Sequence, residues 1–564
     1  MPLASTLNKM IDEICPRFSS HPALSIAMQE PLSYGELHDK IVQTSGLLQD
    51  LSIDKGDPVA ILAENSPEWV ITYFAIVRLG AIVVPILPDF LAQDIHHILR
   101  ETKTRLLFVS SRQLPKLEEF NGKKLRKIIT FDDNKNVTAP PLESLPDLLA
   151  KRPRFSLQTL NKTNQKAGKV LPQDTAAIIF TSGTSGHSKA VMLSHNNLVA
   201  NALSTSNLAT VTADWTFLSL LPLAHAYAFT VNCLVPLLHG SRIVFTDKPP
   251  TPTMLERICR EEKPTAICLV PLIIEKIYKK QILPRLEKAP LLKVALNFPG
   301  LKKMILTRLG KRLLRFLGGE IQLIAIGGAA LNHETEKFLF AARVPYAVGY
   351  GLTEAAPVLS GGPVNDPTIA VGSAGKPLPG VTIKIVSNSP DDQIGEIHAR
   401  GENIMKGYFQ NPDATRETID PDGWLATGDL GYLDQHNNLF ITGRTKNVIV
   451  LPSGKNIYPE HIEDKLNSIA HVAESLLIAN NDRLEAWVYP DYDLIDEETE
   501  DMSPALKRQH IDNLMKEIQR TVNDQLPSFA KIAAVNERRE PFNKTATHKI
   551  KRYLYQSDPR KLDN

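Results

Sequence analysis

A run of glycine, serine and threonine residues that ends in a lysine stands out for its chemistry. It follows the apolar stretch at residues 176–180 directly. Glycines allow close approach of backbone amides to a ligand, and hydroxyl and ammonium groups add further donors. These donors suit phosphate, although the G-x-x-x-x-G-K-[ST] spacing of the common P-loop is absent; an ordinary Ser/Thr-rich surface loop is the alternative. The run comprises Thr181, Ser182, Gly183, Thr184, Ser185, Gly186, His187, Ser188 and Lys189.

Six further motifs carry polar, glycine or basic residues. Each has an ordinary explanation when taken singly: glycine turns after strands, a carboxylate at a helix start, or a solvated basic tail. The motifs occupy residues 221–227 (LPLAHAY), 327–331 (GGAAL), 349–354 (GYGLTE), 424–429 (WLATGD), 443–446 (GRTK) and 541–552 (PFNKTATHKIKR).

The elements that must position these residues alternate short β-rich runs with helical ones, beginning at residues 24–87. This rhythm predicts an α/β body of sheets covered by helices. After about Gly375 short strands and turns predict a β-rich subdomain, and beyond Arg444 a smaller α+β unit of about 120 residues follows. Residues 151–170 are expected to form a loose connection, and the acidic run at residues 493–501 a solvated loop.

Composition narrows the class of protein. The 564 residues suffice for two to four domains, and 64 Lys plus Arg against 62 Asp plus Glu give no overall field that would attract nucleic acid. Four cysteines without a C-x-x-C pair indicate buried thiols in a reducing, cytoplasmic compartment. Residues 1–16 lack the apolar region of a signal peptide and no long uncharged apolar window exists, so membrane contact would be peripheral.

Residues 301–317 form a basic amphipathic pattern. Six Lys or Arg residues are interleaved with Ile305, Leu309, Leu313 and Phe316 at helical spacing. Two interpretations stay open: a helix that lies on an anionic bilayer, and a surface helix whose apolar stripe packs on the sheet.

In this order, the motifs resemble the adenylate-forming superfamily of acyl-CoA synthetases, peptide-synthetase adenylation domains and luciferases. Within it, the chain is most similar to the long-chain fatty acyl-CoA synthetases, from residues 33–37 (SYGEL) to Arg552. The resemblance implies an N-terminal adenylate-forming domain at residues 1–443, a hinge at 444–446 and a small mobile α+β domain at 447–564. It also implies ATP, Mg²⁺ and coenzyme A as cofactors, and a fatty acid as substrate.

The resemblance assigns the nucleotide site to matching residues. Residues 181–189 would wrap the β- and γ-phosphates, with Thr184 and Glu354 at the metal, because Mg²⁺ takes few carboxylates beside phosphate and water. Asp429 and Arg444 would bind the ribose hydroxyls. The adenine slot and its flank would comprise Gly328, Ala329, Gly349, Tyr350, Gly351 and Thr353.

It also assigns the reacting groups. Lys549 would bridge the attacking carboxylate and the α-phosphate, and His225 would stand at the mouth of the acyl site. Lys446 would lie in the hinge, whose rotation presents the turn at Gly454 to coenzyme A. Phe229 matches a gating aromatic of some relatives, with core packing as the alternative, and the acyl tunnel is expected around residues 229–235 and 270–273.

Departures from the family pattern leave rivals open. Ser185, Ser188 and Ala190 replace the usual threonine, proline and glycine, and His548 replaces a frequent glycine, as in many long-chain members. Acyl carrier protein could replace coenzyme A as acceptor, or the chain could be an acyl-AMP ligase. A non-catalytic nucleotide- or lipid-binding relative and a luciferase-like oxygenase are further alternatives, and the oligomeric state stays open.

Overall fold

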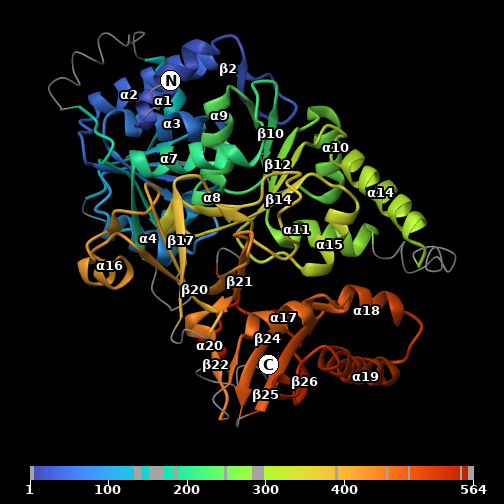
Figure 1. Cartoon of the computed structure of the whole chain (residues 1–564). Coiled ribbons are helices and arrows are strands. Elements are labelled where there is room, and N and C mark those ends of the chain that lie inside the picture. The colour runs from blue at the N-terminus through green and yellow to red at the C-terminus, as the bar shows by residue number, and fades with distance from the viewer. Residues whose placement is uncertain are drawn as a thin grey trace.

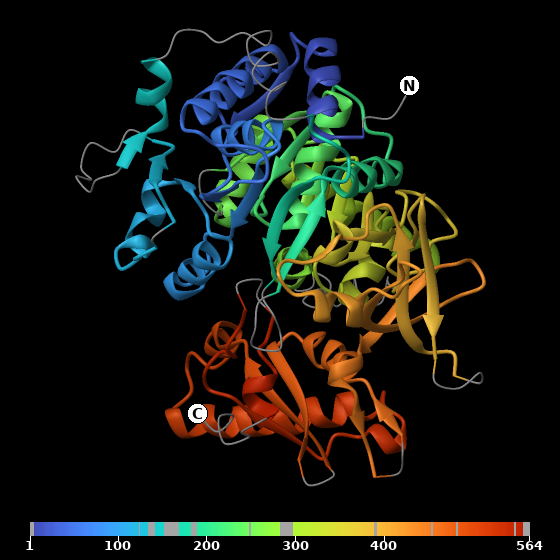
Figure 2. The ribbon, with the colours of Figure 1, turned by 90° about the vertical axis from the view of Figure 1, so that its left-hand side faces the viewer.

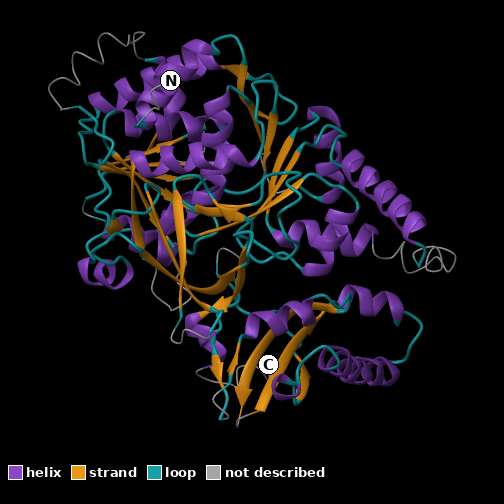
Figure 3. Ribbon diagram, viewed as in Figure 1, coloured by secondary structure: helices purple, strands orange, loops and turns teal. Residues whose placement is uncertain are grey.

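The computed structural model describes residues 5–122, 124–132, 142–151, 169–181, 189–246, 250–282, 297–387, 392–452, 455–480, 483–545 and 549–556. The chain forms a large N-terminal body with a small C-terminal domain on one side of it, as both views show (Figures 1 and 2). Helices surround the sheets of the body (Figure 3). This arrangement confirms the predicted α/β class.

One body sheet has eight strands in the order β19-β9-β8-β4-β3-β5-β6-β7. Strands β8, β4, β3, β5, β6 and β7 run parallel, whereas β8 and β9 form an antiparallel pair. The central strands are almost wholly buried apolar runs, as a sheet covered on both faces requires. The strands are β3 (Pro58–Leu62), β4 (Ile82–Ile86), β5 (Leu106–Val109), β6 (Lys127–Thr130), β7 (Leu142–Ser144), β8 (Thr175–Phe180), β9 (Ala190–Ser194) and β19 (Gly407–Tyr408).

The second body sheet has nine strands in the order β16-β15-β14-β13-β12-β10-β11-β1-β2. Strands β1 and β10 to β14 are parallel, so their carboxyl ends meet at one edge, where α/β sheets bind ligands. The strands are β1 (Pro22–Ile26), β2 (Leu32–Ser33), β10 (Thr216–Ser219), β11 (Arg242–Phe245), β12 (Ala266–Leu269), β13 (Leu323–Ile326), β14 (Tyr346–Gly351), β15 (Val358–Gly361) and β16 (Lys376–Pro377).

Most body helices begin at a polar cap residue, which satisfies free amides of the first turn. Ser33 and Glu36 form a capping box on α2, and Ser194 and Asn197 do so on α7. The helices are α1 (Leu7–Arg17), α2 (Tyr34–Asp50), α3 (Pro67–Arg78), α4 (Ala92–Glu101), α5 (Leu145–Ala150), α7 (His195–Thr205), α8 (Ala226–Phe229), α9 (Val235–His239), α10 (Pro252–Glu262), α11 (Pro271–Ile277), α14 (Pro299–Phe316) and α15 (His333–Ala341).

A four-stranded antiparallel sheet follows the second body sheet and confirms the predicted β-rich subdomain. Its outer strands are β17 (Val381–Val386) and β21 (Leu439–Arg444), and its inner strands are β18 (Gly395–Gly401) and β20 (Leu425–Leu433). Helix α16 (Pro412–Thr418) lies beside it. The strand β21 leads directly to the C-terminal domain.

The C-terminal domain is a two-layered α+β structure with its own apolar core. Helix α19 directs Ile511, Met515 and Ile518 inward, at the spacing of one helical face. The elements are β22 (Ile449–Val450), β23 (Asn456–Ile457), α17 (Pro459–Asn467), β24 (Val472–Asn480), β25 (Arg483–Pro490), α18 (Tyr492–Glu498), α19 (Pro504–Asn523), β26 (Ala534–Glu537) and α20 (Tyr553–Gln556).

The acidic run after Asp491 is a helix, α18, so the prediction of a solvated loop is wrong there. The Asp491 side chain accepts a hydrogen bond from the Leu494 amide as N-cap, and acidic residues in a first turn favour the helix dipole. Ile495 is fully buried and anchors the helix to the domain core. One apolar residue among acids was too weak a periodic signal to predict this.

Two other expectations concern thiols and membrane spans. All four cysteines are free and buried, as predicted. Among the helices of the described part of the chain, none has both the length and the apolar character needed to cross a bilayer.

Candidate active site

The predicted phosphate loop connects the antiparallel strands β8 and β9. Phe180 pairs with Ala190, and the Thr181 amide donates to the Lys189 carbonyl at 2.9 Å, which closes the base of the loop. The loop is therefore the tip of a hairpin rather than the link from a strand to a helix. The predicted ligands Ser182, Gly183, Thr184, Ser185 and Gly186 lie outside the described residues.

Tyr408 links the end of this loop to the predicted metal ligand. The Lys189 ammonium lies 4.4 Å from the centroid of the Tyr408 ring, and the Tyr408 hydroxyl donates to Glu354 Oε1 at 2.9 Å. Burial and the neighbouring carboxylate raise the pKa of Tyr408, so the hydroxyl keeps its proton and remains a donor. No role was assigned to Tyr408 from the sequence.

Glu354 has the chemistry of a magnesium ligand beside phosphates. It lies in a short 3₁₀ turn, η5 (Thr353–Ala355), which directly follows β14 and begins at Thr353. Within the described chain no group of three His, Cys, Asp or Glu side chains gathers as a metal site. A single carboxylate fits Mg²⁺ when nucleotide phosphates and water supply most of the oxygen ligands. Glu354 would hold such an ion, which would neutralise charge on the phosphates.

The predicted adenine slot lies where β13 and β14 end side by side. Ile326 pairs with Val348, so Gly328 and Ala329 follow β13 beside the glycines of β14. Gly328 has φ +88°, a left-handed conformation that favours glycine. A Cβ on Gly351 would stand 1.9 Å from the Pro357 carbonyl oxygen, so only glycine fits there. The structure thus brings the predicted set Gly328, Ala329, Gly349, Tyr350 and Gly351 together.

Asp429, Tyr350 and Arg444 form a hydrogen-bonded group. The Tyr350 hydroxyl donates to Asp429 Oδ2 at 2.8 Å, and Arg444 Nε lies 2.9 Å from Asp429 Oδ1. Asp429 and Arg444 face each other in the register of β20 and β21. Burial and Asp429 raise the pKa of Tyr350, which keeps that hydroxyl a donor. Two residues predicted for the ribose and one predicted for adenine therefore share a single cluster.

Lys549 of the C-terminal domain lies within electrostatic range of the same cluster. Its charge interacts with those of Arg444, Asp429 and Glu354, and with the imidazole of His225. Although part of the side chain contacts solvent, the surrounding protein atoms and then Arg444 lower the pKa of Lys549, while the two carboxylates oppose this shift. The Thr545 amide donates to the Lys549 carbonyl at 2.8 Å, which fixes the backbone of its loop.

His225 caps helix α8 at the edge of this cluster. Its Nδ1 accepts from the Tyr227 amide at 3.3 Å. Burial, and to a lesser extent the Lys549 charge, lower the pKa of His225 to about 4, so the imidazole is neutral at pH 7. Because Nδ1 accepts, the proton resides on Nε2, which suits a donor to a carboxylate or carbonyl oxygen.

The predicted hinge begins at Arg444, which belongs to this cluster. Lys446 is exposed in the 3₁₀ turn η6 (Thr445–Asn447) between β21 and β22. Gly454 lies outside the described residues.

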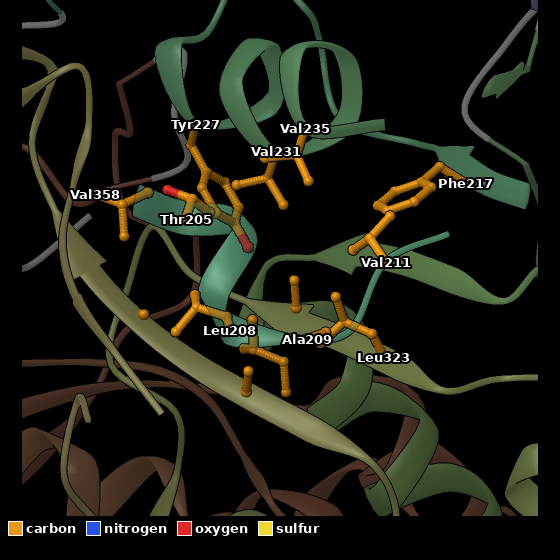
Figure 4. Close-up of a pocket in the computed structure, with 14 residues that line it drawn as sticks. Thr205, Leu208, Ala209, Val211, Phe217, Tyr227, Val231, Val235, Leu323 and Val358 are labelled. Atoms are coloured by element: carbon orange, nitrogen blue, oxygen red, sulfur yellow. The ribbon is translucent and has the colours of Figure 1, made fainter. Parts of the chain in front are cut away.

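An apolar cavity of about 30 Å³ has Gly349 among its lining residues, and Figure 4 shows others, such as Phe217 and Val358. Val231 and Val235 of the predicted tunnel line it, whereas residues 270–273 do not. Val231 belongs to a π-helical segment, η3 (Thr230–Leu234), between α8 and α9. Phe229 is buried outside the cavity, with its ring 4.2 Å from that of Tyr73, so it packs in the core.

Comparison with known proteins identifies the family. Residues 11–409 match the model described as AMP-binding enzyme. Long-chain-fatty-acid–CoA ligase heimdall of Drosophila melanogaster is 28% identical, over 85% of this chain and 75% of the relative. The 4-coumarate–CoA ligase CCL1 of Humulus lupulus is 30% identical, over 83% and 80%.

Solved structures share the fold along nearly the whole chain. The anthranilate CoA ligase AuaEII in complex with anthranoyl-AMP has a TM-score of 0.80 at 21% identity, over 99% of this chain and 98% of that one. ATP-bound MatB from Rhodopseudomonas palustris has a TM-score of 0.75 at 21% identity, over 98% of both chains. Since the family model alone spans well over half of the sequence, this chain belongs to the AMP-binding enzymes and is an AMP-forming acid–thiol ligase of that adenylate-forming superfamily.

Proposed function

We propose that the chain activates a medium- or long-chain fatty acid with ATP and transfers the acyl group to coenzyme A. A carboxylate oxygen attacks the α-phosphate, the bond to the β-phosphate breaks, and pyrophosphate leaves. The thiol of coenzyme A then loses its proton and attacks the acyl carbon, and the carbon–oxygen bond to AMP breaks. The observation that carries this proposal is the meeting of Lys549, Glu354 and the Asp429 cluster beside an apolar cavity.

The charges in this cleft suit the first step. Lys549 is a compact cation that can contact the attacking carboxylate and the α-phosphate together, which offsets their repulsion. Asp429 accepts from the ribose hydroxyls, and the neutral His225 orients the acyl carboxylate through Nε2. Residues 181–189 would hold the leaving pyrophosphate, and Thr184 and Glu354 would hold Mg²⁺, which would neutralise charge on the phosphates.

The second step needs a different placement of the small domain. We assign the domains to residues 1–443 and 447–564, with a hinge at 444–446 around Lys446. The exposed position of Lys446 supports this, because a hinge residue must tolerate a change of backbone angles in solvent. Rotation withdraws Lys549 and presents the turn at Gly454 to coenzyme A.

The cavity supports an alkyl substrate. Its walls are almost entirely aliphatic or aromatic, so they offer an alkyl chain contacts but give a polar acid few hydrogen bonds. A volume of about 30 Å³ holds only one or two water molecules, so the acyl chain must widen it. The π-helical turn at Val231 is an irregular wall of the kind that adjusts at functional sites.

Changing the size of Val235 should shift chain-length preference. We expect Val235→Ala to favour acids longer by one or two methylenes, and Val235→Phe to favour shorter ones. One methylene in an apolar pocket is worth about tenfold or more in kcat/KM ratio. Steady-state kinetics over a saturated acid series measure the effect. Val244→Ala, at a buried strand position outside the cavity, is the control; an unchanged preference in both Val235 variants would contradict the cavity assignment.

An acid panel tests the function itself. Acid-dependent exchange of labelled pyrophosphate into ATP reports adenylation, and AMP release with coenzyme A or acyl carrier protein reports the acceptor. We expect exchange with C8–C18 fatty acids and AMP release with coenzyme A. Pyrophosphate exchange together with AMP release only when carrier protein is added would identify an acyl carrier protein ligase. Pyrophosphate exchange without AMP release to either acceptor would identify an acyl-AMP ligase. No exchange with any acid would leave the non-catalytic alternative.

We further propose that α14 contacts an anionic membrane surface at the cytoplasmic face. The helix packs on the body through Leu306, Gly310 and Leu313; of the stripe described from the sequence, Leu313 is buried and Leu309 and Phe316 are partly buried. Its first turns expose Phe298, Leu301 and Met304 by 57, 44 and 48%. Six basic residues and no acidic one share this helix, so exposed apolar groups and positive charge coincide. A protein docked in this way would take up fatty acid from the membrane in which the acid dissolves.

Charge reversal on α14 should weaken vesicle binding. We expect Lys302→Glu with Lys303→Glu to lower affinity for phosphatidylserine-containing vesicles about thirtyfold, since each basic residue near the surface contributes about 1 kcal/mol. Sedimentation with such vesicles and with pure phosphatidylcholine measures this. The matched control reverses Lys516 and Arg520 on α19, which are also exposed. Equal binding by both doubly reversed proteins would contradict the assignment to α14.

A further inference from the structure

A lysine of the body caps a helix of the C-terminal domain. Lys279, in the π-helical segment η4 (Tyr278–Ile282) that continues α11, directs its ammonium at the end of α17. Its Nζ donates to the carbonyl oxygens of Asn467 at 2.7 Å, Val472 at 3.3 Å and Ile469 at 3.4 Å. Carbonyls at a helix C-terminus lack intrahelical partners and carry partial negative charge. Lys279 therefore supplies from one domain the cation that the helix end of the other domain favours.

A second contact lies beside the first. Asn332 caps α15, its Oδ1 accepting from the amides of Glu334 and Thr335 at 3.1 and 3.2 Å. Its side-chain amide donates to Asp464 Oδ1 of α17 at 3.4 Å. Figure 1 shows α17 on the side of the C-terminal domain that faces α11 and α15. Two described body residues thus bind the same helix at its side and at its end.

Glu275 ties the two contacts together within the body. It lies one helical turn before Lys279, and its Oε1 accepts from the Asn332 backbone amide at 2.9 Å. Burial lowers the pKa of Lys279 and raises that of Glu275, and the attraction between the two charges opposes both shifts. A buried cation with this support is costly to leave without its carbonyl partners.

Helix α17 connects these contacts to the Lys549 loop. Glu463 of α17 forms an ion pair with Arg552 and accepts from the Leu477 amide at 2.6 Å. Arg552 lies three residues after Lys549 and just beyond Ile550, which forms a β-bridge with Lys544. Glu460, one turn earlier, accepts from the Asn447 side chain at the predicted hinge at 2.5 Å. Fixing α17 on the body therefore fixes where Lys549 points.

We propose that Lys279 and Asn332 are positioning residues for adenylate formation: together they clamp α17 and hold Lys549 in the cleft. The clamp must open before the small domain can rotate for the thiol step. Its kinetic consequence rests on the proposed function, whereas its effect on domain orientation does not.

Half-reaction kinetics test the clamp. We expect Lys279→Met to slow pyrophosphate exchange about tenfold or more, the equivalent of one charged hydrogen bond, while thioester formation from supplied acyl adenylate stays within twofold of the parent. Asn332→Asp should act in the same direction, because it keeps the α15 cap but faces Asp464 with a like charge. Lys279→Arg should restore most of the exchange. The control is Lys276→Met, at an exposed position on α11.

Domain orientation gives a readout that needs no catalysis. All four native cysteines are buried, so dyes can be placed on Glu320→Cys in the body and Lys516→Cys in α19. Single-molecule energy transfer should show that fewer molecules of Lys279→Met than of Lys276→Met have the closed arrangement, in which α17 lies against the body. Equal populations, or equal loss of both half-reactions, would overturn the clamp. If the parent protein shows no pyrophosphate exchange but the closed populations of Lys279→Met and Lys276→Met differ, the proposed function is rejected and the clamp is retained.

Discussion

Lys549→Ala is expected to lower acid-dependent pyrophosphate exchange by about 10²–10³-fold, the usual cost of removing one group that stabilises charge in a transition state. Thioester formation from supplied acyl adenylate should change by less than about threefold, because the proposed rotation takes Lys549 out of the cleft before that step. The ratio of the two rates, measured on one preparation, is the quantity of interest.

The surroundings of Lys549 explain why this effect should be large. Glu354 and Asp429 favour the charged ammonium, while the surrounding protein atoms and Arg444 disfavour it and lower the pKa of Lys549. When two anions, the carboxylate and the α-phosphate, enter the cleft, the ammonium gains its partners. A guanidinium is planar and more diffuse, so Lys549→Arg should restore little of the exchange.

Lys551→Ala is the matched control, since Lys551 lies on the same loop with its backbone amide bonded to the Asn543 carbonyl at 2.9 Å. It should leave both half-reactions near the parent values. Equal loss of both half-reactions in Lys549→Ala would contradict a role confined to adenylation.

Sequence periodicity predicted most elements of the body correctly. Long buried apolar runs such as β3, β4 and β8 have no competing helical pattern, which is why periodicity suffices to predict them. The motifs assigned Asp429 and Arg444 to the ribose and Tyr350 to adenine, and the structure brings these three residues together in one cluster. These features depend on local pattern or on residues matched one by one.

Contacts between distant segments could not be predicted in this way. Tyr408 bridges Lys189 and Glu354 only because β19 pairs with β9, more than 200 residues earlier in the chain. Lys279 meets α17 across nearly 190 residues, and in the sequence it is one more lysine of a helical segment. The antiparallel pairing of β8 with β9, on either side of the glycine-rich motif, is likewise a contact that the motif itself does not encode.

Asp429→Asn should impair both half-reactions, in contrast to Lys549→Ala. In the proposed mechanism the adenosine stays bound from ATP through acyl-AMP to AMP, so a residue that holds its ribose acts throughout. Loss of one charged acceptor costs about 1.5–3 kcal/mol, which corresponds to about 10–150-fold in KM for ATP. We expect a similar factor in the apparent affinity for supplied acyl adenylate.

The cluster around Asp429 allows this effect to be dissected. Tyr350→Phe removes the 2.8 Å hydrogen bond to Oδ2 but keeps the carboxylate charge, so it should cost less than Asp429→Asn. Asp434→Asn is the matched control, because Asp434 accepts from the His436 and Asn438 amides in an exposed turn just beyond β20. A loss in Asp429→Asn confined to pyrophosphate exchange would argue against the ribose, since only a group at the α-phosphate should act on the first step alone. Loss of one half-reaction in Lys549→Ala, against loss of both in Asp429→Asn, is therefore what distinguishes a moving catalytic cation from a fixed nucleotide anchor.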